Sequence, residues 1–256
     1  LTSFARMLGQ NFGFRPEHLL AARFSPPQER FEGGKQWAQY LNAIVAEMRT
    51  LPGVKSAGIT SEIPMGQVDT QQGVSAEEQA AAIRTDGVYA SWRLVTPDYL
   101  PTIGVPLLKG RFWREGEDYR VRPILVSQNL AARLWPNGED PLGRQVRMSN
   151  GQTFTVIGVV GDMQHRTLTE GQPTRTVYWP ASRFPWNTMT VVIRVDGDPA
   201  AMAGAMREAM RRVDPMQPLF EIPTMENFVS KVASAPRLAT VLIGLFAGLA
   251  LLLAAV

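Results

Sequence analysis

Two histidines and one nearby carboxylate are the residues whose spacing suggests chemistry. His18 and His165 are the only histidines of the chain, and Asp162 precedes His165 by three positions. On a helix this spacing would bring a carboxylate and an imidazole together, as a hydrolase or a metal site requires. However, Met163 and Gln164 between them add no further ligand, and two residues do not make a metal site. A hydrogen-bonded turn is the favoured interpretation, and a membrane-tethered hydrolase that uses Asp162 and His165 is the third of three functional hypotheses.

Other chemical signatures are incomplete. The stretch NGEDPLGR (Asn137 to Arg144) lacks the Lys and Ser/Thr with which a P-loop holds phosphate and magnesium. No Gly-x-Ser-x-Gly elbow of a serine hydrolase occurs. The acidic pairs Glu77-Glu78 and Glu117-Asp118 are adjacent in sequence, so their side chains point apart and are expected to be solvated charges. The sequence therefore predicts no catalytic, cofactor-binding or metal-binding residue, and no enzyme activity.

Charge and cysteine content exclude further classes. The 256 residues include 26 basic and 23 acidic side chains, which give a net charge of +3. The most basic stretch is the segment 110–122, where four arginines are nearly cancelled by Glu115, Glu117 and Asp118. Nucleic-acid binders concentrate basic charge, so no nucleic-acid partner is expected. The absence of cysteine excludes a disulfide scaffold and thiolate metal sites.

The C-terminal run from Leu238 to Val256 contains no charged residue. About 19 residues make a helix of roughly 28 Å, which nearly matches a bilayer core of about 30 Å. The run therefore predicts the start of a transmembrane helix, in preference to a buried core helix, which would keep a polar face. We interpret the chain as a piece of a larger membrane protein. The residues named for this membrane span are Leu238, Leu242, Ile243, Phe246, Leu249 and Leu253.

Hydrophobic periodicity predicts two β-α-β units that are far apart in sequence. The first has strands at 18–25 and 54–60 around a helix at 34–51, in which apolar residues recur at helical spacing. The second has a strand at 188–195, a helix that begins at Asp198-Pro199, and a last strand at 218–222. Together they suggest an α+β, split ferredoxin-like (porter-type) layout.

The intervening residues predict an inserted, β-rich mixed subdomain. It opens with a polar loop at 65–79 and continues with strands at 89–95, 124–126, 145–148, 153–160 and 177–179. Its tryptophans and the methionines of the helix after 199 are expected in the core, in preference to a partner surface. The predicted boundaries are a membrane-proximal lead-in at 1–16, porter halves at 17–63 and 187–223, the insertion at 64–186, a connecting helix at 224–237 and the truncated span at 238–256.

The order of these elements resembles the extracytoplasmic domain of MacB-like and FtsX-like ABC transporter permeases. The motifs that carry the resemblance are short, and their order and spacing are its specific part. They are GFRPEHLLAARFS (Gly13 to Ser25), LPGVKSAGIT (Leu51 to Thr60), VTPDYLPTIGVPLLKGRFW (Val95 to Trp113), Asn129 to Leu134, NGEDPLGRQV (Asn137 to Val146) and FTVIGVVGDM (Phe154 to Met163).

The resemblance implies a domain of the inner (cytoplasmic) membrane that faces the periplasm or cell exterior. It implies a membrane helix before Leu1, three spans after the domain, and ATP bound by a separate or fused ABC ATPase. A second permease copy and a periplasmic adaptor protein are further implied partners. The expected role is mechanotransmission, in efflux, lipoprotein extraction or control of cell-wall enzymes. A membrane-anchored sensor or ligand-binding domain is the alternative.

Overall fold

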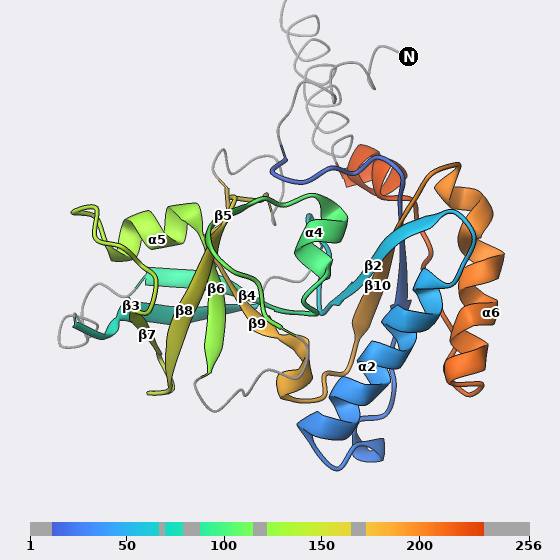
Figure 1. Cartoon of the computed structure of the whole chain (residues 1–256), viewed down its shortest axis with the longest axis horizontal. Coiled ribbons are helices and arrows are strands. Elements are labelled where there is room, and N and C mark those ends of the chain that lie inside the picture. The colour runs from blue at the N-terminus through green and yellow to red at the C-terminus, as the bar shows by residue number, and fades with distance from the viewer. Residues whose placement is uncertain (1–11, 67–69, 79–87, 115–121, 165–172, 233–256) are drawn as a thin grey trace, which may run out of the picture.

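The computed structural model describes residues 12–66, 70–78, 88–114, 122–164 and 173–232. A three-stranded antiparallel part contains β1 (Leu19–Phe24), β10 (Met189–Val195) and β2 (Val54–Thr60), with β10 in the middle. Its strands come from both ends of the described chain, as the two predicted β-α-β units require. We call these strands, with their two helices, the three-stranded part (Figure 1).

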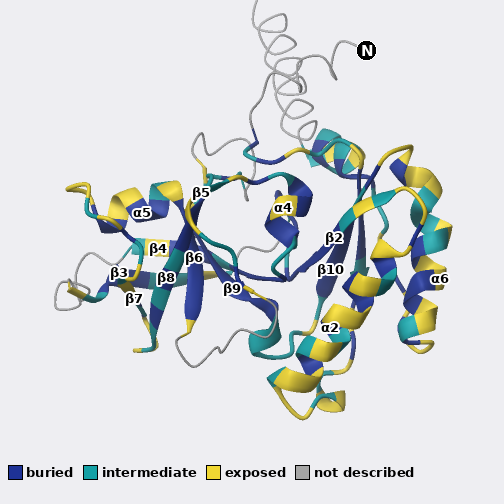
Figure 2. Cartoon of the chain, viewed as in Figure 1, coloured by how far each residue is buried: buried dark blue, intermediate teal, exposed yellow. Residues whose placement is uncertain are grey.

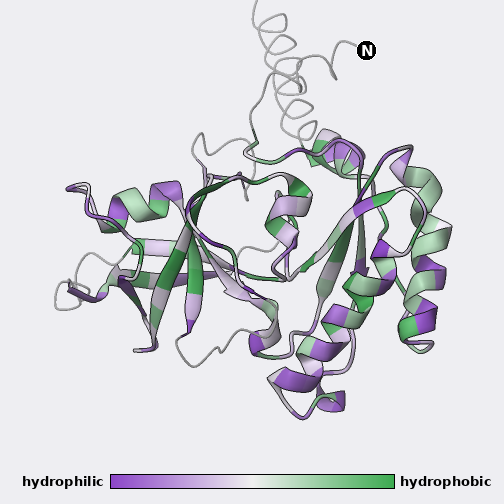
Figure 3. Ribbon diagram, viewed as in Figure 1, coloured by the Kyte–Doolittle hydropathy of each residue, from purple (hydrophilic) through white to green (hydrophobic). Residues whose placement is uncertain are grey.

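Two amphipathic helices cover the three-stranded part. Helix α2 (Gly34–Arg49) buries Trp37, Leu41, Ile44, Val45 and Met48, which recur at helical spacing. Helix α6 (Ala203–Val213) follows a short 3-10 turn, η6 (Pro199–Met202). Figure 2 shows buried inner faces and exposed outer faces on both helices, and Figure 3 shows hydrophilic residues on those outer faces.

The start of the second helix is set by its capping residues. The Asp198 carboxylate accepts the backbone N–H of Ala200 at 2.9 Å, and Pro199 occupies the first helical position. The predicted helix start is thus confirmed. Met206 and Met210 are fully buried and Met202 is partly buried, so this methionine stripe faces the core, as expected.

The second part is a ring of strands. Neighbours around it are β4 (Val88–Val95), β3 (Gln71–Ala76), β7 (Gln145–Met148), β8 (Thr153–Val160), β6 (Pro123–Ser127) and β9 (Thr176–Pro180). Strand β9 then pairs in parallel with β4, from Ser91↔Thr176 to Val95↔Pro180, which closes the ring. Strand β5 (Leu107–Gly110) pairs with β8, and helix α5 (Gln128–Leu134) follows β6. We call this unit the strand ring.

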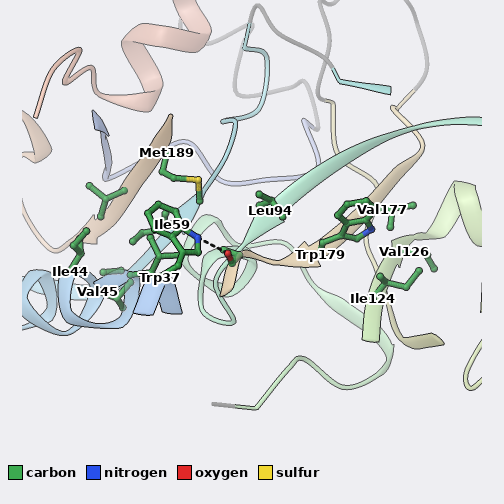
Figure 4. Close-up of a cluster of buried hydrophobic side chains, with 14 of the residues drawn as sticks. Trp37, Ile44, Val45, Ile59, Leu94, Ile124, Val126, Val177, Trp179 and Met189 are labelled. Atoms are coloured by element: carbon green, nitrogen blue, oxygen red, sulfur yellow. Dashed lines mark hydrogen bonds between the residues drawn. The ribbon is translucent and has the colours of Figure 1, made fainter. Parts of the chain in front are cut away.

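Aromatic side chains fill the ring. Trp179 stacks on Trp92 and on Phe154, with ring centroids 5.3 and 5.1 Å away. Among the tryptophans of the insertion, Trp113, Trp135 and Trp179 are buried and Trp92 and Trp186 are partly buried, so the expected core positions are confirmed. Figure 4 shows that Trp179 and its neighbours belong to one hydrophobic cluster with Trp37 of α2.

The sheet connection between the two parts is narrow. Strand β2 pairs with β4 through Thr60↔Val95. The backbone N–H of Ile59 donates to Thr96 Oγ1 at 2.8 Å, and that of Ser61 donates to Leu94 O at 2.8 Å. Helix α4 (Tyr99–Ile103) follows β4 and packs on β2 and β10.

Three sequence expectations need correction. The stretch at 218–222 is not a regular strand: it meets β1 through the isolated bridges Arg23↔Phe220 and Leu20↔Thr224. Glu221 has a φ of 48°, which interrupts an extended run. The loop predicted at 65–79 contains β3, and β5 was not predicted at all. Strand β3 has a polar sequence and lies between β4 and β7, and the short strand β5 pairs with β8.

The ends of the described chain differ from one another. Residues 12–15 are not helical, and Phe12 and Phe14 are buried. Residues 225–232 are helical, with Thr224 Oγ1 accepting the Asn227 N–H at 3.3 Å, as predicted for the connecting helix. Within the described ranges, no helix has the length and apolar character needed to cross a bilayer. The predicted span at 238–256, with all its named residues, lies outside them.

Candidate functional site

Asp162 acts as a structural cap in the described structure. Its Oδ1 accepts the backbone N–H of Asn129 at 2.8 Å, in the first turn of α5. Burial raises the pKa of Asp162, while hydrogen bonds from the backbones of Asn129 and Gln128 oppose that rise. The Asp162 carboxylate thus has a hydrogen-bonded structural role, with a partner 33 positions away in the chain, and the turn predicted for Asp162 and His165 stays a prediction. His165 lies outside the described residues.

The other candidate residues also have ordinary partners. Glu77 forms an ion pair with Arg147, which lowers the pKa of Glu77, and Glu78 lies 2.7 Å from Arg144. His18 Nδ1 lies 3.1 Å from Gly197 O. Glu117 and Asp118 are outside the described ranges. Among the described residues, no group of three His, Cys, Asp or Glu side chains could hold a metal ion.

The structure directs attention instead to residues 12–18, which we call the entry segment. Its first residues contact the end of β8: the Gln164 N–H donates to Phe12 O at 3.0 Å. Gly13 has a φ of 79°, and a Cβ on it would stand 1.9 Å from Asp162 O. A larger residue at position 13 would therefore collide with backbone, so the close contact requires glycine.

Further along the entry segment, Arg194 of β10 gathers three backbone carbonyls. Its Nε donates to Thr102 O at 2.7 Å, Nη1 to Glu17 O at 2.7 Å and Nη2 to Arg15 O at 2.9 Å. Burial lowers the pKa of Arg194, yet a guanidinium remains charged at physiological pH. A single charged side chain thus joins β10, α4 and the entry segment.

The last described residues also return to this end of the domain. The Ala21 N–H donates to Pro223 O at 3.1 Å, and Arg23 and Phe220 exchange two backbone hydrogen bonds of 2.9 Å. Met225 and Val229 are buried in the same hydrophobic cluster as Phe12, Phe14 and α4. Figure 1 shows the entry segment in dark blue and helix 225–232 in red at the same upper end.

A chain of polar contacts runs from this end into the strand ring. Asp162 holds Asn129, and the Ser127 hydroxyl donates to Asn129 Oδ1 at 2.7 Å. The Thr176 N–H of β9 donates in turn to Ser127 Oγ at 2.8 Å. The contact between Gly13 and Asp162 therefore connects the entry segment to α5, β6 and β9.

Sequence reasoning did not find this junction. Gly13 belongs to a quoted family motif, but its contact partner lies about 150 positions away and no local pattern shows it. Arg194 left a weak signal, since it is a lone charge within the apolar strand TMTVVIRV. A charged residue in a buried strand is expected only where it finds partners.

The comparisons with known proteins agree with this architecture. The family model for the MacB-like periplasmic core domain matches residues 8–211. The chain belongs to this family. As a MacB-like periplasmic core domain, it is the extracytoplasmic region of a membrane-anchored ABC transporter permease, a class that works with ABC ATPase partners.

Two solved structures have a similar fold to this MacB-like domain. One is the periplasmic region of MacB from Actinobacillus actinomycetemcomitans, at 14% identity and a TM-score of 0.55, covering 89% of this chain and 97% of that one. The other is a domain of a putative permease protein from Porphyromonas gingivalis, at 16% identity and a TM-score of 0.51, covering 82% and 92%. No curated protein matches the chain.

Proposed function

We propose that this domain couples ATP hydrolysis on a cytoplasmic ABC ATPase to conformational change outside the membrane. Its own residues would then supply mechanical connections and no catalytic step. The observation that carries the proposal is the junction at one end of the domain. There, both the entry segment and helix 225–232 are packed into a single buried cluster with α4. Force applied to either segment would reach packed structure directly, since close-packed cores transmit strain.

The finer architecture belongs to the same proposal. We propose a split ferredoxin-like porter subdomain at 17–63 and 187–223, with the insertion at 64–186. Its support is the spatial order of segment 220–224, β1, β10 and β2, together with two helices that bury side chains in one cluster. The lead-in at 1–16, the connecting helix at 224–237 and the membrane span at 238–256 complete the proposed boundaries.

Membership of this permease family also suggests which partners the domain works with. We propose an ABC ATPase subunit or domain that binds ATP, a second permease copy, and a periplasmic adaptor. Efflux, lipoprotein extraction and control of cell-wall enzymes are the three kinds of work that such a coupler performs. Measuring the mass of the purified full-length permease, with and without its ATPase, tests whether the complex contains a second permease copy.

The coupling itself is tested with two labels in the full-length permease. Ala43 on α2 and Ala132 on α5 are exposed, and the chain has no native cysteine. A permease with Ala43→Cys and Ala132→Cys accepts one spin label on each part of the domain. We expect the distance distribution between the labels to differ between nucleotide-free and ATP-bound permease. A distance distribution that is the same with and without nucleotide would contradict coupling. A distribution that changes only when a small ligand is added would favour the sensor alternative.

A further inference from the structure

We infer that the entry segment acts as a strap that sets the position of the strand ring relative to the three-stranded part. The entry segment has this role in the resting domain, before any force acts on it. Its use as a lever rests on the proposed coupling function, because that function supplies the force on the entry segment.

The direct sheet connection between the two parts is narrow. One ladder pair, Thr60↔Val95, joins β2 to β4, with a backbone hydrogen bond on each side of it, whereas β1 and β10 are paired over six residues from Leu19↔Arg194 to Phe24↔Met189. A ladder of one pair resists bending far less than a ladder of six. The relative position of the two parts therefore also depends on contacts outside this ladder, among them α4 packed on β2 and β10.

A second contact lies at the lower end of the view in Figure 1. There, α2 and the turn before it meet the segment that follows β9. Trp37 Nε1 donates to Ala181 O at 2.8 Å, and Gln28 Nε2 donates to Pro185 O at 3.2 Å. The connection from the strand ring back to β10 also runs through this segment. This contact and the Thr60↔Val95 pair together define a natural axis for relative rotation.

The entry segment lies at the opposite end of the domain. Its residues Phe12 and Gly13 contact the ring side at Gln164 and Asp162, and its carbonyls at Arg15 and Glu17 are held by Arg194 of β10. The entry segment thus contacts both parts, on the side of the proposed rotation axis opposite the contact between α2 and the segment after β9. Arg194 also holds Thr102 of α4, so both grips meet in one packed cluster.

The contact at Gly13 is tight enough to transmit displacement. A Cβ there would meet Asp162 O at 1.9 Å and Met163 Cα at 2.8 Å, so backbone lies directly against backbone. Movement of the entry segment by a fraction of an ångström must move residues 162–164 or break the contact. Asp162 then carries the displacement to α5 through Asn129.

The test uses the Ala43→Cys, Ala132→Cys full-length permease without nucleotide. Gly13→Ala is expected to shift or broaden the resting distance distribution, because the added Cβ pushes the strap off the ring. Gly151→Ala is the matched control: Gly151 has a similar φ of 81° but nothing within 4 Å of the added Cβ, so it carries the same backbone strain without the collision.

Arg194→Met is the second variant, which keeps the proposal testable if Gly13→Ala does not fold. It keeps an unbranched stem but loses all three donors to Thr102, Glu17 and Arg15, and we again expect a shifted or broader distribution. Arg207→Met, on the exposed face of α6, is its control.

Resting distributions that match the parent in both Gly13→Ala and Arg194→Met would overturn the strap. This outcome is separate from failure of the coupling proposal, which would show as a nucleotide-insensitive distribution in the parent itself. Where both ideas hold, Gly13→Ala also loses the nucleotide-driven change while the ATPase remains active.

Discussion

Gly58 of β2 lies directly under Tyr99, the first residue of α4. A Cβ built on Gly58 would stand 2.4 Å from Tyr99 Cα and 2.7 Å from its backbone nitrogen. Only a residue without a side chain lets the helix approach the strand this closely. The contact seats α4, which comes from the insertion, on the three-stranded part.

Gly58→Ala is therefore expected to destabilise the domain. The clash is with backbone, so α4 must move away, and overpacking of this kind costs about 1–3 kcal/mol. Urea denaturation of the purified chain measures the change. Gly204→Ala, at an exposed position of α6 with open space around it, is the control and should instead stabilise by about 0.5–1 kcal/mol. Equal effects of the two changes would contradict the proposed contact.

Trp37→Phe removes the hydrogen bond from Nε1 to Ala181 O that joins α2 to the segment after β9. It leaves a buried carbonyl without that donor, and we expect a loss of about 1–3 kcal/mol in the free energy of unfolding. Trp135→Phe removes the same volume from a buried site where the indole N–H has no hydrogen-bond partner among the described residues. A chemical denaturation series should show the larger loss for Trp37→Phe; a larger loss for Trp135→Phe would rule out this account.

Asp162 predicts a pH dependence whose sign follows from its raised pKa. The folded state binds the Asp162 proton more tightly than the unfolded state does. This residue's contribution to stability is therefore present at low pH and is lost as the pH rises above the ordinary aspartate pKa of about 3.9 and through the raised folded value. Asp162→Asn stays neutral and keeps an acceptor oxygen, so this fall should disappear. Thermal midpoints of both proteins across the acidic range measure it, and parallel curves would contradict the prediction.

Asp198→Ala tests the cap of the second helix. The change removes the bond from the Ala200 N–H, and loss of such a cap typically costs about 1 kcal/mol. Asp196→Ala is the neighbouring control: Asp196 pairs with Lys55 at 2.5 Å on an exposed surface, where an ion pair contributes about 0–1 kcal/mol. The midpoint of urea unfolding should fall more for Asp198→Ala.

Local signals predicted most of the elements because they act within a few residues. The apolar stripe of α2 and the Asp198-Pro199 helix start each specify structure at short range. These signals also placed Met206, Met210 and most tryptophans in the core. They failed at β3, whose polar sequence becomes a strand between β4 and the more distant β7, and at the short β5, which pairs with β8 about 50 positions along the chain.

The sequence by itself determined both helices and the first three strands of the two β-α-β units, the β-rich insertion and the motif order typical of this permease family. Tertiary structure alone decided that the strands of the insertion close into a ring, because closure depends on β9 meeting β4 across about 85 positions. It also decided the junction, where Gly13 meets Asp162 and Arg194 meets Arg15, Glu17 and Thr102. In each contact the partner is a backbone group distant in sequence. Backbone groups are the same in every residue, so even the lone charge of Arg194 could not show which partners it finds.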